Sequence, residues 1–266
     1  MGIVNVTPDS FSDGGRFFDR SRAIAHGLAL RDEGADLLDV GGESTRPGAE
    51  PVSAGEELDR VIPVVEALAR EGARVSVDTS KPEVMRAAIA SGCAVVNDVF
   101  AFRADGSIEA VAGADVGLIA MHMQGTPRTM QQEPRYGDVV AEVGDFLRAR
   151  AAALEAAGVS RERIALDPGF GFGKTLEHNK ALLRGLPALA ALGYPLVVGV
   201  SRKKMISELA GGRDAAERLA GSVAAAVLAA QNGASLLRVH DVKPTVDALN
   251  VWAGLAVQPP STLERR

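Results

Sequence analysis

Two side chains near the end of the chain that can carry positive charge, Arg238 and His240, stand two positions apart. They lie in an apolar run, Ser235–His240, that is typical of a β-strand, so both side chains are expected on one face of that strand. With Lys203 they would form a compact cationic patch, which suits a phosphate or diphosphate because Arg makes bidentate contacts and Lys supplies a point charge. Asn5 offers one amide oxygen to a hard cation, which fits Mg2+ held mainly by substrate phosphates and water.

Polar residues also stand at the ends of the other apolar runs. They are Asp39, Glu43, Asp78, Asn97, Asp98, His122, Asp167 and Asp241. Buried carboxylates are costly unless a partner or a ligand satisfies them. For any single one, a structural ion pair or hydrogen bonds to the backbone explain the residue equally well. For the whole set, a binding site is the better explanation.

Eight short runs rich in β-branched residues alternate with stretches of helical periodicity. We predict strands at Gly2–Val6, Asp36–Gly41, Arg74–Asp78, Ala94–Val99, Gly117–Met123, Ile164–Asp167, Pro195–Val200 and Ser235–His240. The predicted helices span about 21–34, 53–71, 82–91, 107–113, 138–158, 176–192, 214–232 and 243–255. This alternation predicts a single α/β domain over residues 1–256, a closed (β/α)8 barrel, with a doubly wound open sheet as the alternative. In such a barrel the active site is built at the carboxyl ends of the strands, so the polar residues would share one rim.

Signals for helix ends support this arrangement. Ser53 with Glu56 three residues later, Pro82 and Pro244 mark helix starts. Glycines follow the predicted helices where they should end, at Gly34, Gly72, Gly92, Gly158, Gly193 and Gly233.

Two long loops, Thr7–Arg20 and Gly42–Val52, follow the first two predicted strands and are candidate lids over the barrel mouth. The segment PGFGFGKT after strand six matches neither the P-loop nor the dinucleotide pattern. Its glycines are as well explained by a turn as by backbone contacts to a ligand. The histidines show no zinc-binding spacing.

Composition narrows the classes of function. The net charge of −5 disfavours a nucleic-acid-binding protein or a protein held on an anionic membrane. The single cysteine, Cys93, indicates a reducing cytoplasm. We expect no signal peptide and no membrane-spanning segment, and we expect residues 257–266 to form a disordered tail.

Eight motifs together resemble the dihydropteroate synthase family of pterin-binding enzymes. They are NVTPDSFSDGG (Asn5–Gly15), ESTRPG (Glu43–Gly48), VDTSKP (Val77–Pro82), NDV (Asn97–Val99), MHMQGTP (Met121–Pro127), LDPGFGFGK (Leu166–Lys174), SRK (Ser201–Lys203) and RVHDV (Arg238–Val242). The resemblance implies a TIM barrel that condenses 7,8-dihydropterin-6-ylmethyl diphosphate with 4-aminobenzoate, with Mg2+ as cofactor, to give 7,8-dihydropteroate and diphosphate. It also implies a homodimer formed through barrel helices.

The resemblance further implies roles for individual residues. The pterin would be bound by Asp78, Asn97, Met123, Asp167, Lys203 and Arg238. The diphosphate would be bound by Asn5, Arg238 and His240, with Asn5 also holding Mg2+. The aminobenzoate would be framed by Thr45, Arg46, Pro47, Phe172 and Lys203. The implied mechanism is dissociative, with Asp13, Lys203, Arg238 and His240 as catalytic residues.

Two features depart from the family pattern. Most members have further residues before the NVTPDSF strand, and some have a Ser where this chain has Lys204. Two other functions fit part of this pattern. A methyltetrahydrofolate:corrinoid methyltransferase would share the pterin-binding residues but would not need Lys203, Arg238 and His240 for a diphosphate. A catalytically silent pterin-binding paralogue would keep the same residues without turnover.

Overall fold

The structure is a computed structural model that describes residues 1–7, 16–45 and 48–255, with only the backbone described for residues 16–19. The predicted tail, 257–266, lies outside these ranges. The described strands are β1 (Gly2–Asn5), β2 (Leu38–Gly41), β3 (Val75–Asp78), β4 (Val95–Asp98), β5 (Gly117–Met121), β6 (Ile164–Asp167), β7 (Val197–Val198) and β8 (Leu236–Leu237). Each lies within a predicted strand, so the prediction of the strands is confirmed.

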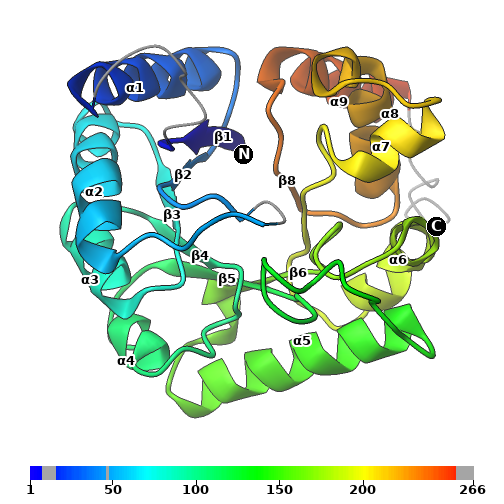
Figure 1. Ribbon diagram of the computed structural model, residues 1–266, viewed down its shortest axis with the longest axis horizontal. Coiled ribbons are helices and arrows are strands. Elements are labelled where there is room, and N and C mark those ends of the chain that lie inside the picture. Colours follow the sequence, from blue (N-terminus) through cyan, green and yellow to red (C-terminus); the bar gives the residue numbers. More distant parts are fainter. Residues whose placement is uncertain (8–15, 46–47, 256–266) are drawn as a thin grey trace, which may run out of the picture.

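These strands form a closed parallel barrel. Strands β1 to β6 pair in sequence order and β7 pairs with β8. Two parallel bridges join these sheets, Leu166 with Leu196 on one side and Gly2 with Val239 on the other. Across the second junction, Ile3 N donates to Val239 O at 3.1 Å. The helices therefore surround a ring of strands, and the chain returns beside its own start (Figure 1).

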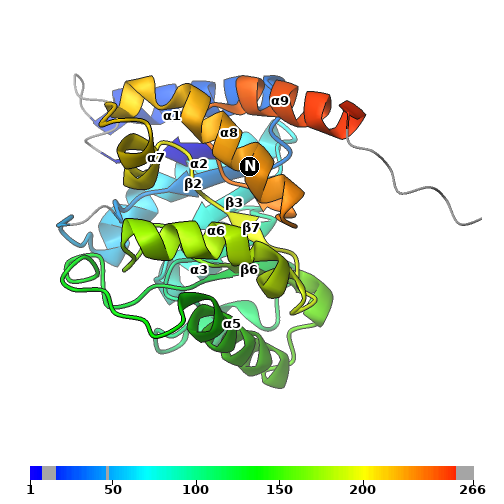
Figure 2. The same ribbon diagram turned by 90° about the vertical axis from the view of Figure 1, so that its right-hand side faces the viewer.

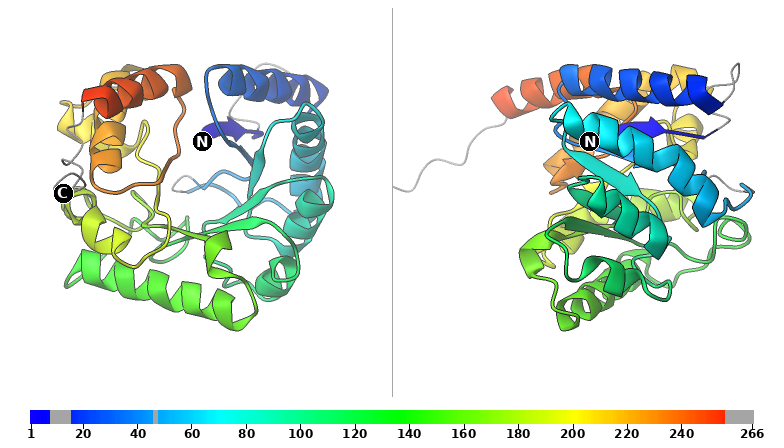
Figure 3. Two further views of the ribbon diagram at one scale, coloured as in Figure 1. Left: turned by 180° about the vertical axis from the view of Figure 1, so that it is seen from behind. Right: turned by 90° about the vertical axis from the view of Figure 1, so that its left-hand side faces the viewer.

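The outer layer consists of helices that follow the strands in turn. They are α1 (Arg16–Asp32), α2 (Ala54–Arg70), α3 (Pro82–Ala90), α4 (Ser107–Val111), α5 (Val139–Ala156), α6 (Leu176–Ala190), α7 (Lys204–Leu209), α8 (Leu219–Gln231) and α9 (Val242–Leu255). Short 3-10 turns, Arg161–Arg163 and Ala215–Glu217, precede β6 and α8. Helices α6, α7 and α8 lie along one side of the barrel, and α1 and α2 lie along the opposite side (Figures 2 and 3).

Two helix predictions were wrong in part. Helix α1 begins at Arg16, inside the stretch that we predicted as the loop Thr7–Arg20. Helix α7 was not predicted, because it has only six residues and its N-cap residue, Lys203, makes no capping hydrogen bond through its side chain. Both helices shorten the loops above the barrel.

The predicted helix ends are confirmed. Ser53 caps α2 by accepting a hydrogen bond from Glu56 N at 3.2 Å, and Pro82 opens α3. Gly34 has a φ of 103°, which places it in the left-handed conformation that ends α1 and turns the chain towards β2. The ring of helices closes where Lys243 N, in α9, donates to Glu33 Oε2 at 3.2 Å.

The barrel interior changes from apolar to polar along the strands. A lower cluster of apolar side chains contains Met1, Leu37, Val95, Ile119, Ala165, Val197 and Leu236. Side chains on a strand alternate between its faces, so the residue two positions further along points to the same side. Two positions after Leu37, Val95, Ala165 and Leu236 stand Asp39, Asn97, Asp167 and Arg238. The apolar cluster is thus the floor beneath a polar chamber. No described helix is long and apolar enough to cross a membrane.

Candidate active site

Arg238 lies at the centre of the polar chamber. Its Nε donates to Asp39 Oδ2 at 2.6 Å, and its Nη2 donates to Asp78 Oδ2 at 2.9 Å. Asn97 Nδ2 also donates to Asp39 Oδ2, at 3.2 Å. Burial opposes the charge of Arg238, but Asp39 and Asp78 outweigh it and raise the pKa of the guanidinium. Arg238 is therefore a fixed cation whose orientation is set by strands β2 and β3.

Two carboxyl groups of the chamber, Asp78 and Asp167, have pKa values above the ordinary value for an aspartate. Burial and the nearby charge of Asp39 raise the pKa of Asp78, although Arg238 opposes this shift. Burial also raises the pKa of Asp167, against the effect of Lys203. Gly169 N donates to Asp167 Oδ1 at 2.7 Å. A ligand that donates hydrogen bonds to these two carboxyl groups would stabilise their charged forms and lower their pKa values.

Lys203 lies against the loop that follows β6. Its Nζ donates to Phe170 O and stands 4.6 Å from the centre of the Phe172 ring. Burial lowers the pKa of Lys203 to about 8, while Asp167 opposes that shift. The structure thus brings together Lys203, Asp167 and Phe172, three of the predicted site residues.

His240 does not add a positive charge to the predicted cationic patch. Its Nδ1 lies 3.0 Å from Ser201 Oγ, and burial together with the charge of Arg238 lowers the pKa of the imidazole to about 4. The ring is therefore neutral at pH 7, and the prediction of a three-cation patch was wrong on this point. A neutral imidazole can still donate one hydrogen bond to an anion.

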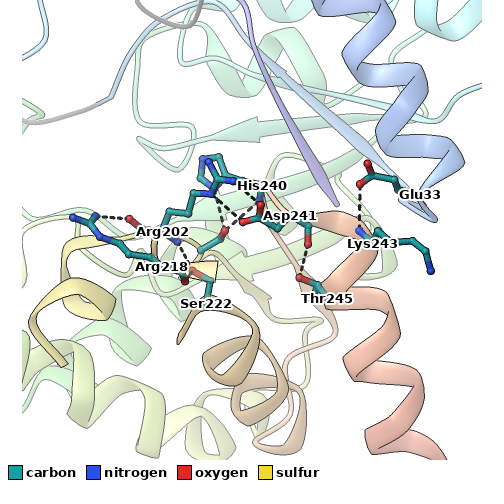
Figure 4. Close-up of polar contacts among 9 residues, drawn as sticks. Glu33, Arg202, Arg218, Ser222, His240, Asp241, Lys243 and Thr245 are labelled. Atoms are coloured by element: carbon teal, nitrogen blue, oxygen red, sulfur yellow. Dashed lines mark hydrogen bonds and ion pairs between the residues drawn. The ribbon is translucent and has the colours of Figure 1, made fainter. Parts of the chain in front are cut away.

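Asp241 at the rim has a structural role. Arg202, in the loop after β7, donates from Nε and Nη2 to its two carboxylate oxygens at 2.9 and 2.5 Å. Ser222 Oγ accepts from Arg202 N, and Arg218 Nη1 donates to Arg202 O (Figure 4). This network joins the loops after β7 and β8, from which Lys203 and His240 extend.

The remaining described site residues also lie at the carboxyl ends of strands. Asn5 is half-buried at the end of β1, paired in register with Gly41. Met123 is buried in an apolar cluster that includes Val99, Met121, Met130 and Phe172. This cluster connects the predicted pterin pocket to the predicted aminobenzoate wall.

The second candidate lid begins at an anchored position. Lys81 donates to Glu43 and, at 2.5 Å, to the buried Glu57 on α2. Thr45 follows Glu43 by two residues and is half-buried. Arg46 and Pro47, on this lid, and Asp13, on the first, lie outside the described residues. Lys204 extends away from the chamber and pairs with Glu208 at 3.2 Å on α7.

The described residues suit Mg2+ only as a lightly held ion. No group of three or more His, Cys, Asp or Glu within the described ranges could hold a metal. Asn5 supplies one oxygen, and its position at the rim matches the coordination of Mg2+ by few protein oxygens and by substrate phosphates.

Two residues with direct contacts to the predicted site received no functional role in the sequence analysis. Asp39 orients both Arg238 and Asn97, as described above. Lys174 is buried beneath the loop that carries Phe172 and donates to Phe172 O at 3.0 Å. The sequence signal for Asp39 is its position two residues after Leu37, which places both side chains on the strand face that points into the barrel. The signal for Lys174 was a lysine that ends an otherwise uncharged glycine-rich segment.

Comparison with known proteins identifies the family. Residues 1–240 match the family described as "Pterin binding enzyme". The dihydropteroate synthase of Neisseria meningitidis serogroup C is 54% identical, with 97% of this chain and 92% of that protein aligned. The solved structure of Xanthomonas albilineans dihydropteroate synthase with 4-aminobenzoic acid has a TM-score of 0.91 at 56% identity, covering 97% of this chain and 93% of that one.

A solved structure of Burkholderia cenocepacia dihydropteroate synthase with 7,8-dihydropteroate has a TM-score of 0.87 at 51% identity, covering 96% of this chain and 90% of that one. The matches extend over nearly the whole chain, including all eight strands that carry the polar chamber. The chain therefore belongs to the dihydropteroate synthase family of pterin-binding enzymes.

Proposed function

We propose that this chain condenses 7,8-dihydropterin-6-ylmethyl diphosphate with 4-aminobenzoate to form 7,8-dihydropteroate and diphosphate. The observation that carries this proposal is the chamber in which Asp78, Asn97, Asp167, Lys203 and Arg238 meet above an apolar floor. Such a chamber fits a flat, polar heterocycle that both donates and accepts hydrogen bonds.

The pterin is bound by the carboxylates and the lysine of the chamber. Asp167 accepts hydrogen bonds from the aminopyrimidinone edge, and Lys203 donates to the ring carbonyl oxygen. Asp78 and Asn97 bind the opposite side of the heterocycle, and Met123 packs against it. Arg238 lies over its face, held by Asp39 and directed towards the rim.

The reaction begins with loss of the leaving group. The bond between the pterin methylene carbon and the diphosphate oxygen breaks, and the diphosphate leaves with the electron pair. Arg238 and His240 stabilise the departing anion by hydrogen bonds that strengthen as its charge develops. Asp13 on the first lid stabilises the positive charge that remains on the methylene carbon.

The aminobenzoate then captures that carbon. Its amine nitrogen forms the new carbon–nitrogen bond and loses a proton. Thr45, Arg46, Pro47 and Phe172 frame the aromatic ring together with Lys203, and closure of the lids keeps water from reacting with the cation. The pairing of Lys204 with Glu208 supports a recognition of the aminobenzoate carboxylate that does not depend on Lys204.

Mg2+ would be held by Asn5 together with the diphosphate oxygens. When bound, it neutralises the charge that accumulates on the leaving group. Asn5 would supply one amide oxygen to the metal. Its half-buried position at the end of β1 suits this role.

The protein is proposed to act as a homodimer in the cytoplasm. Helices α7, α8 and α9 present large apolar side chains to solvent, namely Leu209, Leu219, Leu228, Val251 and Leu255. Covering this surface with a second copy removes it from water. Light scattering of the wild type and of Leu228→Glu tests the dimer, which the substitution should dissociate.

The proposed location in the cytoplasm is supported by the cysteine content of the sequence. Its one cysteine, Cys93, is buried and unpaired.

A coupled assay tests the proposed activity. Purified protein is mixed with the pterin diphosphate, 4-aminobenzoate and Mg2+, and both diphosphate release and pteroate formation are measured. The proposal requires pteroate formation that depends on the aminobenzoate, with release of at least one diphosphate for each pteroate formed. Binding of the pterin diphosphate without either product would instead identify a catalytically silent paralogue.

A further inference from the structure

The loop after β6, Pro168–Gly173, has a backbone that needs external support. Gly169, Gly171 and Gly173 have φ angles of 67°, 80° and 63°, which place all three in the left-handed region. A Cβ on Gly169 would lie 1.9 Å from His122 O, so the loop is pressed against the end of β5. Its carbonyl groups cannot form a regular ladder in this conformation.

Side chains from outside the loop bind each carbonyl from residue 169 to residue 173. The partners are Lys174 Nζ for Gly169 and Phe172, Lys203 Nζ for Phe170, Gln131 Nε2 for Gly171 and Tyr136 OH for Gly173. Of these donors, Lys174 alone holds two carbonyls, at 2.9 and 3.0 Å. It therefore fixes both ends of the Gly169–Phe172 segment.

Lys174 is almost entirely removed from solvent, with 3% of its surface exposed. Its third contact is His122 Nδ1 at 2.9 Å. When Lys174 is charged, its ammonium group cannot accept a hydrogen bond, so the imidazole accepts through Nδ1 and carries its own proton on Nε2. Burial and the charge of Lys174 lower the pKa of His122 to about 3, which agrees with a neutral ring.

A buried lysine without a carboxylate in hydrogen-bond contact is costly to the fold. Burial lowers the pKa of Lys174 to about 7, with Asp167 opposing that shift. A leucine or methionine would fill the same volume at less cost, so the position of this charge calls for a role in the loop itself. The loop carries Phe172 against Lys203 and directs Gly169 N at Asp167.

We propose that Lys174 is a positioning residue for the aminobenzoate side of the active site, acting through the carbonyls of Gly169 and Phe172. This inference rests on the proposed synthase function. By holding Phe172 O, Lys174 places the aromatic ring beneath the Lys203 ammonium, 4.6 Å from its centre. Phe170 O accepts a hydrogen bond from Lys203, so both lysines bind carbonyl groups of the same loop.

Lys174→Met tests this role because it retains the length of the side chain and removes its donors. Lys180→Met is the matched control, since Lys180 lies on the following helix, α6, and its ion-pair partner among the described residues is Glu177. We expect the KM for 4-aminobenzoate to rise about tenfold or more in Lys174→Met, as for the loss of a hydrogen bond to a charged group. The Kd for the pterin diphosphate should change by less than about threefold, because Asp167 and Lys203 remain.

A purely structural role would give a different pattern, in which Lys174→Met lowers the melting temperature and the active fraction but leaves the KM for 4-aminobenzoate unchanged. That pattern overturns the inference, as does an equal rise in KM for Lys180→Met. Absence of activity in wild type would contradict the proposed function instead. If Lys174→Met does not fold, Lys174→Gln replaces it, because its side chain keeps a polar donor but is one atom shorter and cannot hold both carbonyls at the positions that Nζ reaches. The expected rise in KM is then about threefold, and an unchanged KM overturns the inference.

Discussion

The contact between Asp39 and Arg238 makes a quantitative prediction about stability. Asp39 is fully buried and accepts hydrogen bonds from Arg238 Nε at 2.6 Å and from Asn97 Nδ2 at 3.2 Å. Asp39→Asn keeps the size of the side chain but removes the negative charge. It leaves the buried guanidinium with Asp78, at 2.9 Å, as its neutralising hydrogen-bond partner among the described residues.

The expected loss in the free energy of unfolding for Asp39→Asn is smaller than the loss for an ion pair whose remaining charge has no partner. Removing one member of a buried ion pair costs about 3–5 kcal/mol when the other charge is left uncompensated. Here Asp78 remains, and Asp39 Oδ1 is itself buried without a hydrogen-bond partner within the described part of the chain. We therefore expect a loss of about 2 kcal/mol in the free energy of unfolding. For a domain of this size that corresponds to a decrease in melting temperature of about 4–8 °C.

Thermal unfolding followed by circular dichroism measures this change. Asp115→Asn is the control, because Asp115 is exposed and precedes β5 at the opposite end of the barrel, so the same substitution should leave the melting temperature unchanged. Calorimetric titration with the pterin diphosphate should also show weaker binding to Asp39→Asn, since Arg238 loses one of its two anchors. If Asp39→Asn has the same melting temperature as the wild type, this carboxylate does not stabilise the fold through Arg238, and the reasoning is refuted.

Three further predictions concern charge. Because Lys203, with its pKa lowered by burial to about 8, must be protonated to donate to the pterin, kcat/KM should fall as the pH rises through about 8. Lys203→Arg should move that decline to higher pH, and an unmoved decline assigns it to another group. Lys81→Met leaves the buried Glu57 without its ion-pair partner and should lower the free energy of unfolding, measured by urea titration, by about 3 kcal/mol. The control Lys243→Met breaks an exposed ion pair with Asp247 and should have little effect in the same titration. Chelation with EDTA should reduce pteroate formation at least about tenfold, with recovery on adding Mg2+; full activity in EDTA would remove the metal from the proposal.

The barrel could be predicted from sequence because its signals are local. Each strand is a short run of mainly apolar residues, and six of the predicted helices are followed by a glycine such as Gly34, so the order of elements follows from neighbouring residues alone. Helix α7 gave no such signal. It has six residues, too few for a recognisable period, and its formation depends on packing of Met205 and Ile206 into the core.

The site could be predicted only as a set of residues at one rim. Alternation along the strands places Asp39 and Asn97 inside the barrel, but it does not say which residue binds which. The neutral state of His240 depends on burial and on the nearby guanidinium of Arg238, which are properties of the folded chamber. The contacts of Lys174 to two carbonyls likewise require left-handed glycines whose angles no local pattern specifies.

The charge balance of the chamber explains why an acidic protein could require a metal to bind a small anion. Among the described residues, the cations Lys203 and Arg238 lie near three carboxyl groups, the buried Asp39 and Asp167 and the half-buried Asp78. Even with a proton on Asp78, whose pKa is raised by burial, these groups leave no excess positive charge for a diphosphate. The neutral imidazole of His240 adds a hydrogen bond but no charge. Attraction of the diphosphate must then come from a positive charge added at the rim, where Asn5 would hold Mg2+ in the proposed function. Binding of the diphosphate is therefore expected to be coupled to binding of Mg2+, because the metal ion supplies the positive charge that the chamber lacks.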